Sequence, residues 1–234
     1  MQTIEIYGYI GDTEDGVTDR TFSDDMRAVE SGESLRALVN SGGGSVFQGL
    51  TIYQELVSHD GPVMVEVRGV AASIASVIAM AGDSMEMHQS SRFMIHNAMG
   101  PSALAFGNSS DLREAATDTL KTADLLDSIS AGAADIYAAR TGAPRAEITE
   151  MMNQETWLTA ADSLRLGFTQ SVIASKQLVA KLRTIATPRT DQITSSEELE
   201  AVAALCRQLT IRVPIKADPA ALRLARAKLA HLAD

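Results

Sequence analysis

The sequence is poor in cysteine and in long apolar runs. Cys206 is the only cysteine among 234 residues, so the chain cannot form an internal disulfide, which fits a reducing compartment. No apolar run approaches the roughly 20 residues that a membrane-spanning helix requires. The N-terminus lacks the basic and apolar segments of a secretory signal. We therefore expect a cytoplasmic protein with no membrane partner.

Basic residues are also scarce relative to acidic ones. The chain has 20 Lys and Arg against 30 Asp and Glu, a net charge of −10, which argues against a nucleic-acid partner. The basic residues gather near the C-terminus, where residues 176–234 have a net charge of +4. This shift predicts a domain at residues 1–175 and a C-terminal extension at 176–234, either mostly helical or partly disordered.

Strand-like and helix-like segments alternate along residues 1–175. Strands are expected at 3–10, 35–40, 62–68, 85–88, 92–95 and 168–174, with an extended stretch at 154–158. Helices are expected at 24–29, 46–57, 74–81, 108–140 and 146–153, with one more after Thr159. This order predicts an α/β fold in which right-handed crossovers build a mostly parallel sheet. A break at Gly69 is expected to end the third strand.

Three polar or glycine-rich features lie where predicted strands end: a glycine turn at residues 42–44, Ser73 and His96. Sites in parallel sheets form beyond the carboxyl ends of the strands. Ser73 precedes a predicted helix, whose free N–H groups and dipole would stabilise an oxyanion. The competing interpretations are that Ser73 only caps the helix and that His96 is structural.

The sequence contains no metal-binding or nucleotide-binding motif, and it contains one long helical segment. No group of His, Cys and carboxylate residues has metal-ligand spacing, and no Walker A motif follows the glycine turn, so neither a metal nor a cofactor is expected. The long segment 108–140 repeats apolar residues at helical spacing. It is expected to contact either another subunit or the sheet of its own subunit.

Three ordered segments resemble motifs of the ClpP serine peptidases. Residues 40–46, NSGGGSV, resemble N-S-P-G-G-x-V. Residues 69–73, GVAAS, resemble the nucleophile motif G-x-A-A-S, and residues 91–96, SRFMIH, resemble S-R-x-M-I-H. Residues 155–162, ETWLTAAD, are similar to the segment that carries the family's catalytic acid. The resemblance extends over about residues 4–174.

The resemblance implies a serine endopeptidase with three catalytic residues. Ser73 would be the nucleophile and His96 the general base, with an oxyanion hole formed by the backbone N–H groups of Gly44 and Ile74. Glu155 stands at the position of the family's aspartate and is one methylene longer.

Two further residues are alternatives for the acid. These are Asn153 and Asp162, although Asp162 more naturally belongs to the following helix. Gly42 replaces the proline of the family motif, which should loosen the turn without removing the N–H donors.

The resemblance also implies architecture and partners. It implies a ClpP/crotonase-like superhelix of repeated β-α-β units. Residues 108–140 would form the handle helix through which a homo-oligomeric ring stacks on a second ring. The assembly would cleave proteins or peptides. Little precedes the first strand, which argues against docking to a Clp ATPase. The extra tail resembles phage-encoded head-maturation proteases, which would act on capsid or portal proteins in the prohead.

Three alternatives remain open. A crotonase-type acyl-CoA enzyme shares the fold but does not need Ser73 and His96 together. A scaffold subunit would form rings without a reactive serine. A Ser–Lys peptidase would need a lysine at the site, and Lys121 is the only lysine in residues 1–175.

Overall fold

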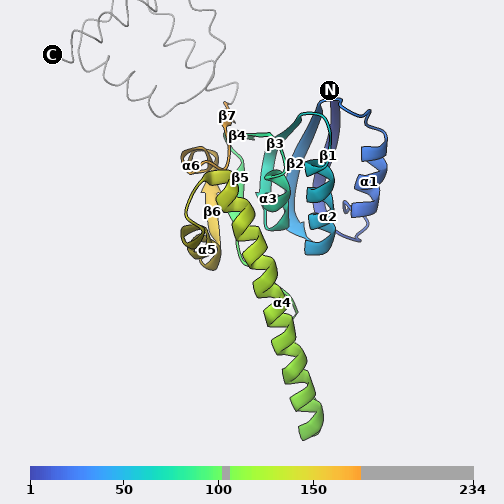
Figure 1. Ribbon diagram of the computed structural model, residues 1–234, viewed down its shortest axis with the longest axis vertical. Coiled ribbons are helices and arrows are strands. Elements are labelled where there is room, and N and C mark those ends of the chain that lie inside the picture. Colours follow the sequence, from blue (N-terminus) through green and yellow to red (C-terminus); the bar gives the residue numbers. More distant parts are fainter. Residues whose placement is uncertain (102–105, 175–234) are drawn as a thin grey trace, which may run out of the picture.

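The computed structural model describes residues 1–101 and 106–174 (Figure 1). The elements in chain order are β1 (Gln2–Ile10), α1 (Asp19–Arg27), β2 (Leu35–Gly44), α2 (Val46–Val57), β3 (Val63–Ala72), α3 (Ile74–Ala79), β4 (Ser84–His88), β5 (Arg92–Ile95), α4 (Ser109–Thr141), α5 (Arg145–Asn153), β6 (Thr156–Thr159), α6 (Ala160–Arg165) and β7 (Ser171–Ile173). In the part described, no helix is both long and apolar enough to cross a membrane. The predicted extension at 176–234 lies outside the described residues.

The strands form one mixed sheet that is mostly parallel. Strands β1, β2, β3, β4 and β7 lie side by side in this order, and β5 pairs in parallel with β3 and antiparallel with β6. Because β1 to β4 follow each other across the sheet in chain order, right-handed crossovers put α1, α2 and α3 on the same face (Figure 1). The predicted parallel α/β sheet is therefore confirmed.

The core lies between this face and the three helices. Alternate residues of each strand point toward the helices and are buried, while their neighbours point to the opposite face. The buried side chains on the helix side include Ile4, Ile6, Ala37, Val39, Val65, Val67, Met85 and Met87.

Two strands are longer than the sequence pattern predicted. β2 continues through the glycine turn to Gly44, and β3 continues through Gly69 to Ala72. Ladder pairing explains both extensions, because Gly44 pairs with Ile10 and Ser41 pairs with Ala71 after register shifts in β1 and β2. The expected strand break at Gly69 was therefore wrong.

The first helix also begins earlier than expected. The side chain of Thr18 accepts a hydrogen bond from the backbone N–H of Thr21, and the Thr21 hydroxyl accepts one from the backbone N–H of Thr18. This reciprocal capping box starts α1 at Asp19. Thr21 therefore stabilises the first turn of the helix.

Helix α4 is anchored to the body only at its C-terminal end. Asn108 caps its start, and Gly142, with a φ of 72°, ends it. Of its 33 residues, only Ala134 and Tyr137 are buried. The remainder extends away from the sheet (Figure 1). The helix therefore does not lie along the sheet of its own subunit, and a contact with another subunit stays a prediction.

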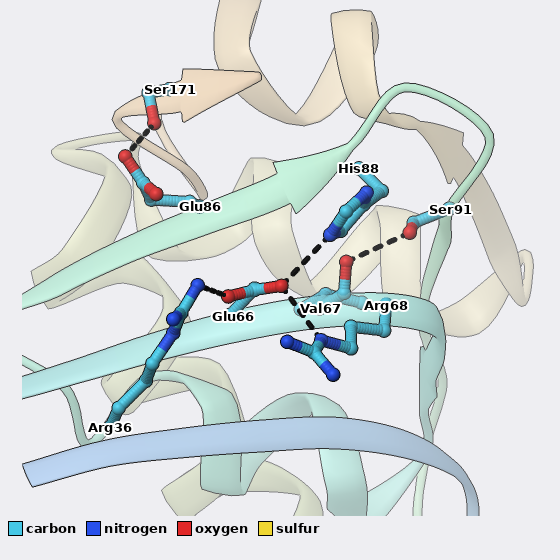
Figure 2. A network of polar contacts seen from close by, with 8 residues as sticks. All are labelled: Arg36, Glu66, Val67, Arg68, Glu86, His88, Ser91 and Ser171. Atoms are coloured by element: carbon cyan, nitrogen blue, oxygen red, sulfur yellow. Dashed lines mark hydrogen bonds and ion pairs between the residues drawn. The ribbon is translucent and has the colours of Figure 1, made fainter. Parts of the chain in front are cut away.

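The sheet face opposite the helices holds a buried carboxylate (Figure 2). The side chain of Glu66 on β3 is only 2% exposed and accepts hydrogen bonds from Arg36, from Arg68 Nε at 2.8 Å and from His88 Nε2 at 2.8 Å. Burial alone raises the pKa of Glu66, but the bonds from Arg68, His88 and Arg36 together outweigh it and lower the pKa to about 2. The cluster therefore ties β2, β3 and β4 together through one charged group.

We expect Glu66→Gln to lower the free energy of unfolding at pH 7 by about 3 kcal/mol, because it removes the buried carboxylate charge that pairs with Arg36 and Arg68. The folded pKa of Glu66 lies below its ordinary value of 4.5, so its stabilisation is present above pH 4.5 and is lost as the pH falls toward 2. The difference between variant and wild type should therefore shrink over this range in urea unfolding at several pH values.

Glu86→Gln is the matched control for this measurement. Glu86 lies on the neighbouring strand and accepts a hydrogen bond from the neutral Ser171 hydroxyl at 2.6 Å (Figure 2). We expect it to change the stability by less than about 1 kcal/mol. Equal effects of the two variants, or a difference for Glu66→Gln that does not vary with pH, would contradict the assigned role of Glu66.

Candidate active site

Ser73 lies at the junction where β3 ends and α3 begins. Its backbone has a φ of 56° and a ψ of −132°, which is uncommon for a residue with a side chain. The backbone N–H of Ser73 donates to Met94 O at 3.2 Å, and its carbonyl accepts from Ser76 N at 2.9 Å. The Ser73 side chain makes no capping hydrogen bond to α3. The interpretation of Ser73 as a simple helix cap is therefore wrong.

His96 follows the last residue of β5 and contacts Ser73 directly. β5 runs parallel to the end of β3, with Met94 opposite Ala72, so the residues after these two strands lie side by side. His96 Nε2 is 2.7 Å from Ser73 Oγ, within hydrogen-bonding distance. Two residues 23 positions apart in the sequence thus form the nucleophile–base geometry of a serine hydrolase.

The glycine turn at the end of β2 packs against Ser73. A Cβ atom added to Gly43 would lie 2.7 Å from Ser73 Cβ and 2.8 Å from Ala72 O, and the φ of Gly43 is +98°. At Gly44, an added Cβ would meet the carbonyl oxygen of Ile10 at 2.1 Å. Both glycines are required for the backbone to pass this closely between β1 and the serine.

Backbone N–H groups border the same space. Ile74 is the first residue of α3, so its N–H has no partner within the helix. Gly43 N–H donates to Ser41 Oγ at 3.1 Å, and Ser41 Oγ in turn donates to Gly8 O at 2.7 Å. These contacts fix the turn that precedes Gly44, the residue expected to donate the second oxyanion bond.

Glu155 lies across from His96 but is not hydrogen-bonded to it. Strands β5 and β6 are antiparallel with Ile95 opposite Thr156, so one further step in this register sets His96 against Glu155. The Glu155 carboxylate instead accepts from Trp157 Nε1 at 3.3 Å, and the Glu155 backbone has a φ of 48°. Within residues 1–101 and 106–174, Nδ1 of His96 has no hydrogen-bond partner.

The two alternatives for the third catalytic residue, Asn153 and Asp162, are engaged elsewhere. Asn153 Oδ1 accepts from Asn97 Nδ2 at 2.9 Å. Asp162 closes the capping box of α6 with Thr159 and pairs with Arg165. The hydrogen bonds from Thr159 and Arg165 lower the pKa of Asp162. Asp162 therefore stabilises a helix start, as its position in the sequence suggested.

Lys121 is in no position to form a Ser–Lys pair. It lies on the part of α4 that extends from the body, where its Nζ is 3.0 Å from Asp118 Oδ1, and its side chain is 71% exposed. The group that contacts Ser73 Oγ is the imidazole of His96. The geometry thus favours a Ser–His mechanism over a Ser–Lys mechanism.

Comparison with known proteins agrees with this geometry. The sequence profile of the family described as Clp protease matches residues 19–176, more than half of the chain. The chain belongs to the Clp protease family. Membership implies a serine protease of the ClpP type. The match also favours a peptidase over an acyl-CoA enzyme of the same fold.

Individual Clp proteins are similar to this chain over part of their length. The ATP-dependent Clp protease proteolytic subunit 1 of Protochlamydia amoebophila is 30% identical over 152 residues, covering 64% of this chain and 70% of that subunit. The ATP-dependent Clp protease proteolytic subunit of Deinococcus radiodurans is 32% identical over 143 residues, covering 60% of this chain and 65% of that subunit.

The fold is also shared with a solved Clp structure. A ClpP1 mutant from Listeria monocytogenes matches with a TM-score of 0.58 at 21% identity, covering 75% of this chain and 92% of that one. This likeness confirms the ClpP-like α/β fold with its long helix. The narrower resemblance to phage head-maturation proteases and the expected lack of a Clp ATPase partner stay predictions.

Sequence reasoning missed two features of the site. Gly43 was treated only as part of a turn, yet it is the glycine that lies against Ser73. Ser76, in the first turn of α3, donates a hydrogen bond from its hydroxyl to Ser73 O at 2.6 Å. The three consecutive glycines were the available signal for the first, and no sequence signal identifies the second.

We expect Gly43→Ala to abolish reaction at Ser73, because its Cβ would displace the serine and because the backbone has a φ of +98°. Gly42→Ala is the matched control, since a Cβ at Gly42 meets no atom within 4 Å. Measurements of peptidase activity and thermal unfolding should show a folded, inactive Gly43→Ala variant and a folded, active Gly42→Ala variant. An active, folded Gly43→Ala variant would refute the close approach of the turn to Ser73.

Proposed function

We propose that this Clp-family chain is a serine endopeptidase in which Ser73 is the nucleophile and His96 is the general base. The observation that carries the proposal is the distance of 2.7 Å between His96 Nε2 and Ser73 Oγ. A base within this distance can accept the proton while the serine oxygen attacks. The half-buried position of His96 leaves the pair open to substrate.

The reaction proceeds in two steps through an acyl-enzyme. Ser73 Oγ attacks the carbonyl carbon of the scissile peptide bond as His96 takes up the hydroxyl proton. The tetrahedral intermediate collapses, the C–N bond breaks, and His96 gives the proton to the leaving amine. In the second step, His96 deprotonates a water molecule that attacks the acyl carbon, and Ser73 regains its proton when the ester bond breaks.

The oxyanion of the intermediate is stabilised by backbone groups. The N–H groups of Gly44 and Ile74 are the proposed donors, supported by the close packing of the glycine turn on Ser73 and by the position of Ile74 at the start of α3. Removal of one such donor costs about 10²–10³ in rate in other enzymes. This magnitude accounts for a turn built from three glycines at this place.

Glu155 is the proposed partner of His96 Nδ1. It stands one step beyond the paired residues Ile95 and Thr156, and among the described residues its carboxylate accepts a hydrogen bond only from Trp157, at 3.3 Å. Rotation of this exposed side chain would replace its hydrogen bond from the indole N–H of Trp157 by one from the imidazole N–H of His96. The carboxylate would then fix the tautomer of His96 and stabilise the imidazolium ion.

The proposed substrates are proteins and peptides that enter a ring of identical subunits. The relatives that match are proteolytic subunits of ATP-dependent Clp proteases, as their names state. The exposed length of α4, with Leu112, Leu120 and Leu125 among its exposed apolar side chains, supports its use in assembly. Cleavage of phage capsid or portal proteins is a narrower role that rests on sequence resemblance alone.

We expect a fluorophosphonate probe to label the purified full-length protein at Ser73. Ser73→Ala should lose both labelling and hydrolysis of fluorescent casein, because the nucleophile is absent, while His96→Ala should label far more slowly. Peptide mapping by mass spectrometry identifies the modified residue, and size-exclusion chromatography with light scattering shows whether each variant assembles. An unlabelled, inactive wild type that still forms rings would favour the scaffold alternative.

We expect Glu155→Ala to reduce kcat less than Ser73→Ala does, because the serine and the oxyanion donors remain in place. Glu155→Asp restores the shorter carboxylate of the family and should retain more activity than the alanine variant. Asn153→Ala is the matched control from the same segment. A kcat that is unchanged in Glu155→Ala but reduced in Asn153→Ala would transfer the orienting role to Asn153.

A further inference from the structure

A hydrogen-bonded pair of hydroxyls links the long helix to the element that carries Ser73. Ser76 Oγ on α3 is 2.7 Å from the phenol oxygen of Tyr137 on α4. Ser76 is 0% exposed and Tyr137 is 1% exposed, so water does not compete for either group. The pair connects two residues 61 positions apart in the sequence.

The direction of each hydrogen bond follows from the number of protons. Ser76 Oγ carries one hydrogen, which it donates to Ser73 O at 2.6 Å. Tyr137 must therefore donate its phenol hydrogen to Ser76 Oγ. Burial raises the pKa of Tyr137, and the bond with Ser76 offsets only part of this rise, so the phenol keeps its proton at neutral pH.

This chain of bonds ends on the residue whose backbone is strained. Ser73 O accepts from both the backbone N–H of Ser76 at 2.9 Å and its hydroxyl at 2.6 Å. A positive φ at a residue with a side chain is unfavourable and persists only where neighbouring contacts hold it. Ser76 is thus one of the groups that keep the Ser73 carbonyl, and with it the direction of Oγ, in place.

Tyr137 is itself held firmly near the C-terminal end of α4. Its ring packs edge-on against Phe168, with centroids 5.9 Å apart. Phe168 packs in turn on Phe93, at 5.3 Å, and Phe93 lies on β5, the strand that leads to His96. Ser130, two turns earlier on α4, accepts a hydrogen bond from Ala98 N at 2.9 Å. The C-terminal part of α4 therefore contacts the elements that carry or flank Ser73 and His96.

We propose that Ser76 and Tyr137 are positioning residues that hold the Ser73 nucleophile at its reactive angle through the bonds Tyr137 O–H to Ser76 Oγ and Ser76 O–H to Ser73 O. The inference rests on the proposed role of Ser73. Neither hydroxyl touches the substrate or the reacting atoms. Their removal affects the chemical step because a nucleophile turned slightly away from its base reacts more slowly.

The test compares variants of the full-length protein that remove one hydroxyl each. Tyr137→Phe keeps the ring contact with Phe168 but removes the donor to Ser76. Its fluorophosphonate labelling rate and its kcat on a fluorogenic peptide should fall about fivefold, the effect of one neutral hydrogen bond, with KM unchanged. Ser76→Ala should lower both rates about thirtyfold, because it removes two bonds.

Thr169→Val is the matched control. Thr169 is 2% exposed, and its hydroxyl donates to Met85 O at 2.7 Å and makes no bond to Ser73. Thermal unfolding of all variants measures their loss of stability. Thr169→Val should retain the wild-type labelling rate and kcat even where its melting temperature falls as much as that of Tyr137→Phe.

Two outcomes would overturn the inference while the proposed function stands. One is a folded Tyr137→Phe variant with wild-type labelling rate and kcat. The other is an equal loss of rate in Tyr137→Phe and Thr169→Val, which would assign the effect to general destabilisation. If Ser76→Ala fails to fold, the labelling rate and kcat of Tyr137→Phe alone test the inference. A wild type that is not labelled at Ser73 would overturn the proposed function and the inference together.

Discussion

The backbone conformation of Ser73 is the constraint on which the arrangement of the site depends. A φ of 56° turns the chain sharply from β3 into α3, so that Ser73 Oγ points toward His96 and not back onto the helix as a cap. Such a conformation is unfavourable by itself and needs support from its surroundings. That support comes from β5 at the Ser73 N–H, from Ser76 at the Ser73 carbonyl, and from Gly43, which lacks a side chain at the point of closest approach.

The parallel sheet brings these supports together from distant parts of the sequence. The ends of β2, β3 and β5 meet at one edge because neighbouring strands run in the same direction, so the glycine turn, Ser73 and His96 converge there. On the opposite face, Glu66 ties β2, β3 and β4 through hydrogen bonds from three basic side chains. The sheet therefore serves as a rigid frame whose charged face and reactive edge are separate.

Sequence patterns predicted the frame well and the details of the site less well. The alternation of strands and helices and the three motifs at strand ends were sufficient to predict the sheet, Ser73 and His96. They could not predict that β2 and β3 continue through their glycines, since strand pairing across bulges depends on partners far away in the sequence. Neither Ser76 nor Tyr137 carries a local signal. Glu155 lies opposite His96 by register, but its side-chain direction depends on contacts that no pattern specifies.

The most direct test of the account is a crystal structure of the full-length protein treated with a peptide boronic acid. Boronic acids form a tetrahedral adduct with an activated serine that mimics the intermediate. The account predicts a covalent bond from boron to Ser73 Oγ, a boronate oxygen that accepts hydrogen bonds from Gly44 N and Ile74 N, and Glu155 turned toward His96 Nδ1. A boronate bound at another residue, or a Ser73 adduct whose oxygens point away from both N–H groups, would contradict it.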